Sequence, residues 1–90
     1  YEATVAQLQK ITKRIHEYLL KNTDLETHSD KVSTVVRIDE LSHSSIDILC
    51  HFFTKTLEWN EYTRVKEQCL LEIMCIIEEE GATLSLPTYY

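Results

Sequence analysis

The order in which the hydrophobic spacing changes along this chain constrains its fold more than any other feature. Apolar residues recur every three or four positions over residues 4–21, as they do on one face of a helix. β-Branched and aromatic residues then dominate residues 32–41 and 46–54, on either side of a short polar connection. The helical spacing returns over residues 60–80, and residues 83–86 form a short extended segment before a proline. We therefore predict a helix, two strands, a second helix and a last strand.

The ends of the second helix are marked by particular residues. Asn60 is the predicted N-cap, and Glu61 follows in the first turn, where the helix dipole favours an acid. Gly81 is predicted to end the helix, since glycine readily adopts the positive φ of a helix C-terminus. The acids at residues 78–80 lie at the negative end of the dipole, which costs about a few tenths of a kcal/mol each. We expect packing to outweigh that cost.

The predicted order, α-β-β-α-β, is an α+β fold. It corresponds to a ferredoxin-like β-α-β-β-α-β unit whose first strand is missing and is expected immediately before Tyr1. Residues 1–90 suit a single domain, and a start at Tyr1 without an initiator methionine suggests a fragment of a larger protein. Such sheets carry both helices on one face. The predicted core is Val5, Leu8, Ile11, Ile15, Leu19, Val36, Ile38, Ile46, Ile48, Phe52, Val65, Cys69, Ile73 and Ile76.

Some apolar residues remain after this core is assigned. On the second helix, Leu71 and Cys75 fall on the side opposite the predicted core stripe. In the second strand, alternation places Leu49 and Phe53 on the face that the helices leave uncovered. Scattered exposure of single apolar residues is common and is one explanation. The alternative, which we favour, is that these four residues form patches that a neighbouring subunit or domain covers.

Composition excludes several classes of function. The formal net charge of −6 and the pI near 5.1 argue against nucleic-acid binding, which requires clustered basic residues. The cysteines, Cys50, Cys69 and Cys75, are an odd number and indicate a reducing compartment rather than a disulfide framework. No apolar run approaches the roughly 20 residues of a membrane-spanning helix. We expect a soluble domain that is not itself inserted in a membrane.

No residue pattern in the chain predicts catalysis, a metal or a cofactor. Cys50 and His51 are adjacent in a strand and should therefore point to opposite faces, so they cannot act as a nucleophile and its base. The three cysteines lack the two-residue spacing of a zinc knuckle. The single glycine, Gly81, is assigned to a helix terminus, which leaves none for a phosphate-binding loop. We predict that the domain is not an enzyme.

Three motifs in register resemble the small-conductance mechanosensitive channel (MscS-like) family. Residues 35–41, VVRIDEL, followed by SSIDI at 44–48, are similar to the strand–turn–strand of that family. The second helix from Tyr62, its IIEEEG ending at Gly81, and the LSLPT segment at 84–88 resemble the family's final helix and last segment. The chain departs from the family at Leu84 and Leu86, where relatives often carry phenylalanine, and at His51. The resemblance extends over nearly the whole chain.

The resemblance implies a homoheptameric membrane channel that opens under bilayer tension and releases solutes during osmotic downshock. The domain would then be part of a cytoplasmic vestibule, or cage, on the inner side of the bacterial inner membrane. It would follow a β-domain and a transmembrane pore in the same chain and serve in structure and assembly. The alternative is a free-standing ferredoxin-like ligand-binding or regulatory module. Several apolar stretches of about 20 residues upstream of Tyr1 would favour the channel.

Overall fold

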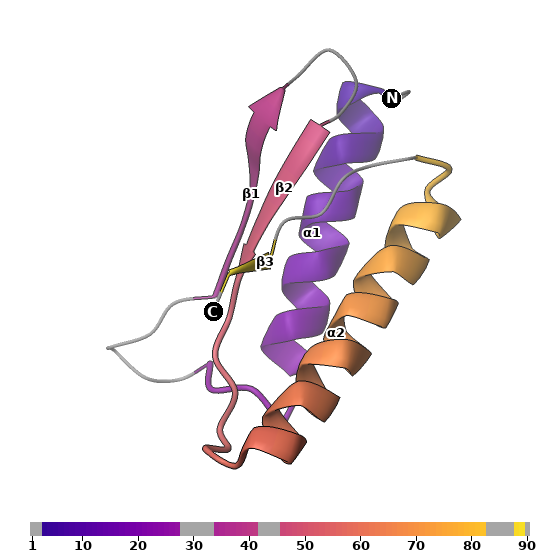
Figure 1. Ribbon diagram of the computed structural model, residues 1–90. Helices are drawn as coiled ribbons and strands as arrows, with labels where there is room; N and C mark the ends of the chain where they lie inside the picture. Colours follow the sequence, from indigo (N-terminus) through magenta and orange to yellow (C-terminus); the bar gives the residue numbers. More distant parts are fainter. Residues whose placement is uncertain (1–2, 28–33, 42–45, 83–87, 90) are drawn as a thin grey trace.

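The computed structural model describes residues 3–27, 34–41, 46–82 and 88–89, and its elements follow the predicted order (Figure 1). Helix α1 spans Val5–Lys21, strand β1 Val35–Leu41, strand β2 Ile46–His51, helix α2 Trp59–Glu79 and strand β3 Thr88–Tyr89. The sheet order is β1-β2-β3, with β1 and β2 antiparallel and β2 and β3 parallel. The predicted α+β class is confirmed. The ferredoxin-like topology, with its missing strand, stays a prediction.

Helix α1 begins and ends where its sequence predicts. The side chain of Thr4 accepts a hydrogen bond from the backbone N–H of Gln7 at 3.1 Å. The Gln7 side chain in turn accepts one from the backbone N–H of Thr4 at 2.7 Å, which completes a capping box. Ile11, Ile15 and Leu19 follow at four-residue intervals, and all three are fully buried. The capping box therefore fixes the first turn, and burial of one stripe fixes which side faces the core.

The strands are shorter than predicted. Strand β2 ends at His51 rather than at residue 54, because the backbone beyond it turns to another partner. The carbonyl of Phe53 accepts a hydrogen bond from the N–H of Glu26 at 2.8 Å, and Thr54 forms an isolated bridge with Leu25. Strand β3 pairs with only the last two residues of β2. The last strand predicted at residues 83–86 lies outside the described residues, as do residues 32 and 33 of the first.

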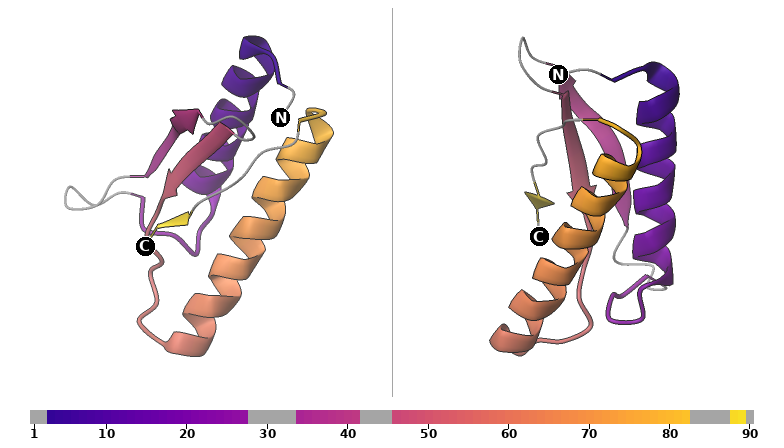
Figure 2. Two further views of the ribbon diagram at one scale, coloured as in Figure 1. Left: turned by 45° about the horizontal axis from the view of Figure 1, so that its top comes forward. Right: turned by 90° about the vertical axis from the view of Figure 1, so that its right-hand side faces the viewer.

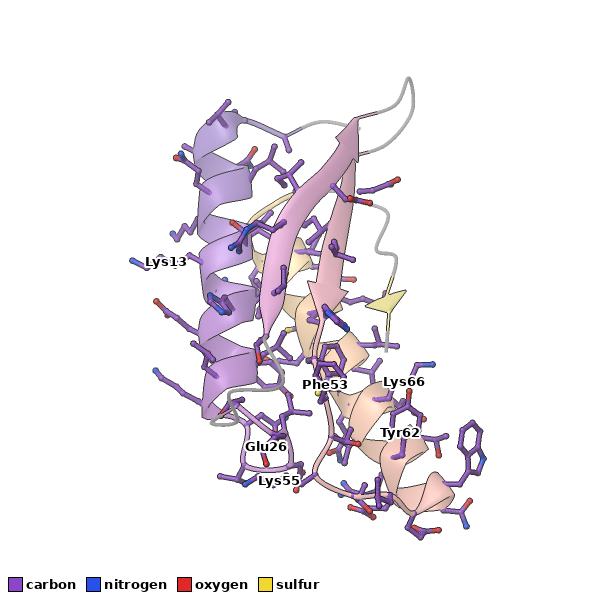
Figure 3. The ribbon with its side chains drawn as sticks, turned by 90° about the vertical axis from the view of Figure 1, so that its left-hand side faces the viewer. Lys13, Glu26, Phe53, Lys55, Tyr62 and Lys66 are labelled. Carbon is purple, nitrogen blue, oxygen red and sulfur yellow. The ribbon has the colours of Figure 1, made fainter. Side chains whose placement is uncertain are left out.

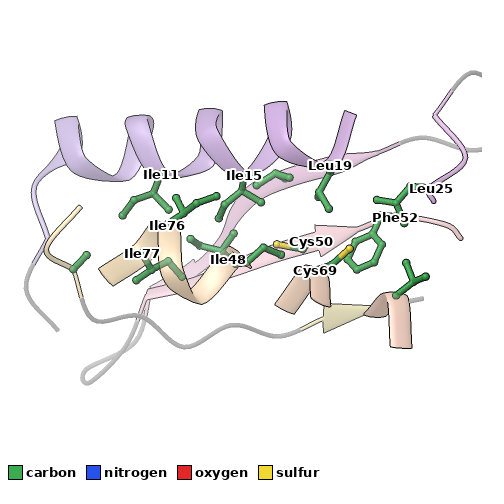
Figure 4. Close-up of a cluster of buried hydrophobic side chains, with 14 residues drawn as sticks. Ile11, Ile15, Leu19, Leu25, Ile48, Cys50, Phe52, Cys69, Ile76 and Ile77 are labelled. Carbon is green, nitrogen blue, oxygen red and sulfur yellow. The ribbon is translucent and has the colours of Figure 1, made fainter. Parts of the chain in front are cut away.

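Both helices pack against the same face of the sheet. Core side chains from β1 and β2 meet those of α1 and α2 in one buried cluster (Figure 4). The sheet lies in front of the helices when it is viewed from its other side (Figure 3), and the two helices run side by side (Figure 2). The arrangement is two-layered, and the helices leave one sheet face uncovered. The predicted core residues confirmed as buried are Ile11, Ile15, Leu19, Val36, Ile48, Phe52, Val65, Cys69, Ile73 and Ile76.

The prediction of burial is wrong for two of the core residues, and a third is only half-buried. Val5 is 72% exposed, because it stands about 80° around the helix from the centre of the buried stripe at 100° per residue. Ile38 is 40% exposed, since it lies in an edge strand next to a β-bulge. Leu8 is half-buried, and the side chain of Ile46 lies outside the described residues. The core also contains residues that were not predicted for it, namely Leu25, Cys50, Ile77 and Ala82.

The start of α2 differs from the prediction by its capping residue. The N-cap is Glu58 rather than Asn60, and the helix begins at Trp59. The Glu58 carboxylate accepts hydrogen bonds from the backbone N–H groups of Asn60 and Glu61 at 3.1 and 2.8 Å. A carboxylate with two oxygens satisfies two helix-terminal donors at once and also suits the positive end of the dipole. The predicted helix end is confirmed, since Gly81 has φ of +76°.

The acidic end of α2 is held by cations from α1. Arg14 pairs with Glu79 at 2.7 Å and with Glu80 at 2.8 Å, while Lys10 lies 3.6 Å from Glu80. The Gln7 side-chain amide donates to the backbone carbonyl of Glu80 at 2.9 Å. We call these five residues the helix clamp. The hydrogen bonds to Glu79 and Glu80 raise the pKa of Arg14. Ion pairs therefore join packing in offsetting the acids at the negative end of the helix.

The helix clamp predicts that Arg14 contributes to stability through its partners rather than through its charge alone. We expect Arg14→Gln to lower the urea midpoint of unfolding more than Lys13→Gln, an exposed neighbour on the same helix. The difference between the two variants should shrink at 1 M NaCl, because salt screens exposed ion pairs. Urea unfolding followed by far-UV circular dichroism measures it. Equal effects of the two substitutions would rule out the clamp as a stabilising contact.

The burial of individual α2 side chains predicts how much their truncation lowers the free energy of unfolding. Ile73 is fully buried and Met74, the next residue, is exposed. We expect Ile73→Ala to lower the free energy of unfolding by about 2–5 kcal/mol, since it leaves a cavity. The matched control, Met74→Ala, should change it by less than about 0.5 kcal/mol. The same urea titration tests both, and a Met74→Ala loss as large as that of Ile73→Ala would contradict the assigned orientation of α2.

Candidate interface surfaces

The sheet face turned away from the helices carries two of the predicted interface residues. Leu49 and Phe53 alternate with the buried Ile48, Cys50 and Phe52, so their side chains point to the other side. Both are half-buried. The described part of the structure thus places Leu49 and Phe53 on the uncovered sheet face, as predicted.

Charged and aromatic neighbours share this face. Leu49 lies opposite Arg37 in the antiparallel register, and the Phe53 ring packs 4.9 Å from the His51 ring. His51 lies on the face opposite Cys50, which agrees with the predicted alternation. The surface is therefore mixed, with apolar side chains set among polar ones. That composition is common in interfaces that are not permanently buried.

The other two predicted residues lie on the outer side of α2. Leu71 is 58% exposed, and Cys75, one turn further along, is also exposed. Exposed Met74 lies beside them. This side of α2 is opposite to Cys69 and Ile73, which face the core. The four predicted residues therefore form two separate surfaces, the sheet face and the α2 face, with the core between them. Whether either surface contacts a neighbour stays a prediction.

An aromatic pocket, which was not predicted from the sequence, lies at the end of β2. Its volume is about 450 Å³, and four rings contribute to its lining. Leu57 is fully exposed at its rim, Trp59 is 72% exposed, and the Trp59 and Tyr62 rings are 5.7 Å apart. Leu57 and Trp59, two large apolar residues in the connection predicted before Asn60, were the signal that could have revealed it, because polar residues prevail in connections. The lining residues are Phe52, Phe53, Thr54, Thr56, Leu57, Trp59 and Tyr62.

Two polar side chains that line the aromatic pocket, Thr54 and Thr56, form hydrogen bonds within the connection itself. The Thr54 hydroxyl donates to the backbone carbonyl of Thr56 at 3.1 Å. The Thr56 hydroxyl accepts a hydrogen bond from the backbone N–H of Glu58 at 3.2 Å. These contacts stabilise the turn into α2. They leave the pocket with a mainly apolar character.

The buried thiols are core residues. Burial raises the pKa of Cys50 to about 12, and burial also raises the pKa of Cys69. The Asn22 side-chain amide donates to the Tyr18 hydroxyl at 3.3 Å and lies 3.6 Å from the Cys69 sulfur. Desolvation raises the pKa of Tyr18 to about 12. This polar cluster ties the end of α1 to α2, while burial favours the neutral forms of the Tyr18 hydroxyl and the Cys69 thiol.

Over residues 3–27, 34–41, 46–82 and 88–89, His, Cys, Asp and Glu side chains do not gather in a group that could hold a metal ion. The described helices are too short or too polar to cross a bilayer. The candidate surfaces in the part of the chain that the structure describes are the sheet face, the α2 face and the aromatic pocket.

Comparison with known proteins gives a consistent assignment. The family model described as the C-terminal part of the mechanosensitive ion channel MscS matches residues 1–84. An uncharacterised MscS family protein of Aquifex aeolicus is 31% identical over 88 residues, which cover 98% of this chain and 23% of that protein. The low conductance mechanosensitive channel YnaI of Escherichia coli is 24% identical over 83 residues, 92% of this chain and 23% of the channel.

A Helicobacter pylori protein of the MscS family shows higher identity over a shorter region. It is 38% identical over 58 residues, which cover 64% of this chain and 9% of that protein. This chain thus spans less than a quarter of the length of these curated relatives. No solved structure gives a significant match.

Thiol reactivity tests the assignment of exposed and buried cysteines. We expect one of the three thiols, Cys75, to react with Ellman's reagent in the folded chain, and all three after unfolding in urea. The charge of Glu79 and other nearby acids raises the pKa of Cys75, so its rate should increase with pH and with added salt. The Cys75→Ser variant should lose the reactive thiol. Fast labelling of that variant would show that Cys50 or Cys69 is accessible.

Proposed function

This chain belongs to the MscS family of mechanosensitive ion channels, as the C-terminal domain, and on that premise we propose that it forms part of a cytoplasmic cage below a membrane pore. The single observation that supports this most is the family match, because it extends over residues 1–84. The relative from E. coli carries the name of a mechanosensitive channel. The domain's role in this proposal is structural and excludes catalysis. Family membership favours the channel over a free-standing regulatory module.

The parent protein of this proposal is a homoheptameric channel in the bacterial inner membrane. The channel opens under bilayer tension and releases solutes on osmotic downshock, and the cage lies on the cytoplasmic side. The upstream β-domain and the transmembrane pore belong to the same chain. The limited share of the relatives that this chain covers, 9–23% of their length, is consistent with such further parts.

Two separate surfaces suit a subunit in a ring. A closed ring uses a heterologous interface, in which one patch of each subunit contacts a different patch of the next subunit. The sheet face, with Leu49 and Phe53, and the α2 face, with Leu71 and Cys75, lie on opposite sides of the core. A twofold dimer, by contrast, needs only one self-complementary patch. We therefore propose that the sheet face of one copy faces the α2 face of the next.

The sheet edge is consistent with a ferredoxin-like unit in the parent chain. In that topology a strand preceding α1 would lie between β2 and β3 and run antiparallel to both. In the structure β3 pairs directly with β2 at Cys50 and His51, so such a strand would have to displace β3 there. The first four residues of β2 pair with β1 alone among the described strands and leave that part of the edge open. Ala3 packs against the core, and Thr4 has extended backbone with φ −84° and ψ 162°.

The channel function and the assembly of the full-length protein can be tested together. Expressed in a bacterial strain that lacks its own mechanosensitive channels, the full-length protein should produce tension-gated currents in membrane patches and increase survival of osmotic downshock. We expect Leu71→Asp to reduce the assembled fraction and both readouts, since a buried unpaired charge weakens an interface. Mass photometry in detergent measures the assembly.

The matched control is Gln9→Asp, because Gln9 is an exposed polar residue of α1 and lies outside the α2 face. It should leave assembly and current unchanged. Absence of tension-gated current from the unmodified protein, despite its presence in the membrane, would contradict the channel function. Full assembly of Leu71→Asp would instead contradict only the role of the α2 face.

A further inference from the structure

We propose that the exposed guanidinium of Arg37, on the sheet face of one copy, pairs with the Glu78 carboxylate on the α2 face of the next copy. This inference rests on the proposed function, because it assumes that these two faces meet. It names the partner of Arg37 as a second copy of this chain and the contact as one ion pair. The pair would fix the orientation of one face against the other.

Glu78 lies on the α2 face together with the residues that define it. Seven residues separate it from Leu71, which returns it to within about 20° of the same side of the helix. It follows Cys75 by three residues, so these two side chains are neighbours on the helix surface. The charge of Glu79 and of other acids nearby, Glu78 among them, raises the pKa of the Cys75 thiol. The apolar α2 face therefore ends in a region of negative potential.

The charge of Glu78 is not compensated by the part of the chain that the structure describes. The helix clamp supplies cations to the next two acids, since Arg14 pairs with Glu79 and Glu80, and Lys10 lies near Glu80. The ion pairs among the described residues do not include the Glu78 carboxylate. This carboxylate also lies at the negative end of the α2 dipole, where a cation is favoured. A cation from outside the domain would therefore be stabilised here.

Arg37 supplies a cation in a suitable place on the sheet face. It is exposed and lies opposite Leu49 in the antiparallel register, so both side chains point away from the helices. Its guanidinium donates to the backbone carbonyl of Val36 at 3.1 Å, and it forms no ion pair with a described residue. A guanidinium has several N–H donors, so this contact leaves others for a carboxylate. Asp47, an acid on the same face, already interacts within the domain.

The distance between the charged and the apolar residue is similar on the two faces. Residues directly opposite in an antiparallel pair, as Arg37 and Leu49 are, have Cβ atoms about 4.5–5.5 Å apart. Residues three apart on a helix, as Cys75 and Glu78 are, have Cβ atoms about 5–6 Å apart. With Leu49 packed on Cys75, one orientation of the two faces also brings Arg37 to Glu78. The ion pair would select that orientation, since charge complementarity fixes the register of an interface.

Charge reversal in the full-length protein tests the ion pair. We expect Arg37→Glu and Glu78→Arg each to lower the assembled fraction several-fold, because each brings two like charges together. The double variant restores opposite charges and should recover most of the assembly of the unmodified protein. The control, Lys13→Glu, makes the same change of charge as Arg37→Glu at an exposed site of α1 and should have no effect. Mass photometry in detergent measures assembly, and far-UV circular dichroism verifies that each variant is folded.

Cross-linking provides a second measurement that does not depend on opposite charges. Arg37→Cys and Glu78→Cys are introduced together into full-length protein that carries Cys75→Ser, and a short bismaleimide is added. We expect a ladder of products with the masses of two, three and more subunits. Each single cysteine variant in the same background should remain monomeric in the denaturing gel, because the contact joins different patches of two copies.

Several results would overturn the proposal. They are full assembly of either single charge-reversal variant, a double variant that assembles no better than the single ones, and absence of the ladder. A cross-linked product of monomer mass would also overturn it, because the two residues would then meet within one copy. Patch recordings on the unmodified protein keep the two proposals apart: tension-gated current without recovery in the double variant contradicts only the ion pair, and recovery without current contradicts only the channel function.

Discussion

The burial of one stripe of α1 is the constraint on which the rest of the structure depends. Ile11, Ile15 and Leu19 are completely removed from water, and no single element could cover all three. Strands β1 and β2 supply one wall, through Val36 and Ile48, and α2 supplies the other (Figure 4). A chain of 90 residues has material for only one such core. The helices therefore gather on one sheet face, and the described part of the chain leaves the opposite face uncovered.

The helix clamp sets the relative direction of the two helices. Gln7, Lys10 and Arg14 are spaced by three and four residues, so they lie along one side of α1. All three reach the last turn of α2, where the acids at residues 79 and 80 coincide with the negative end of the helix dipole. A parallel arrangement of the helices would instead bring the cations, Lys10 and Arg14, to the positive end of the α2 dipole. The electrostatics thus favour the antiparallel pair that the core also requires.

The elements were predictable to the extent that local signals determine them. The start of α1 was placed by hydrophobic periodicity, and the structure adds a capping box there. The end of α2 was placed by Gly81, the single glycine of the chain, which readily adopts positive φ. The Glu58 cap was missed because asparagine is the commoner N-cap and periodicity does not distinguish a start at Trp59 from one at Asn60. The end of β2 at His51 depends on a hydrogen bond to Glu26, which is distant in sequence and cannot be read from the strand itself.

The exposed apolar residues were predictable from the sequence one by one, but their grouping into two surfaces on opposite sides of the domain was not. Helical and strand periodicity identified Leu71 and Leu49 as apolar residues outside the core, and the structure agrees. Their location on opposite sides of the domain follows only from the packing of α2 over the sheet, which is a long-range property.

The aromatic pocket was missed for the same reason, since residues from the end of β2, the connection and the first turns of α2 build it together. In the proposed ring, the sheet face and the α2 face would contact the two neighbouring copies, and the aromatic pocket shares only Phe53 with them.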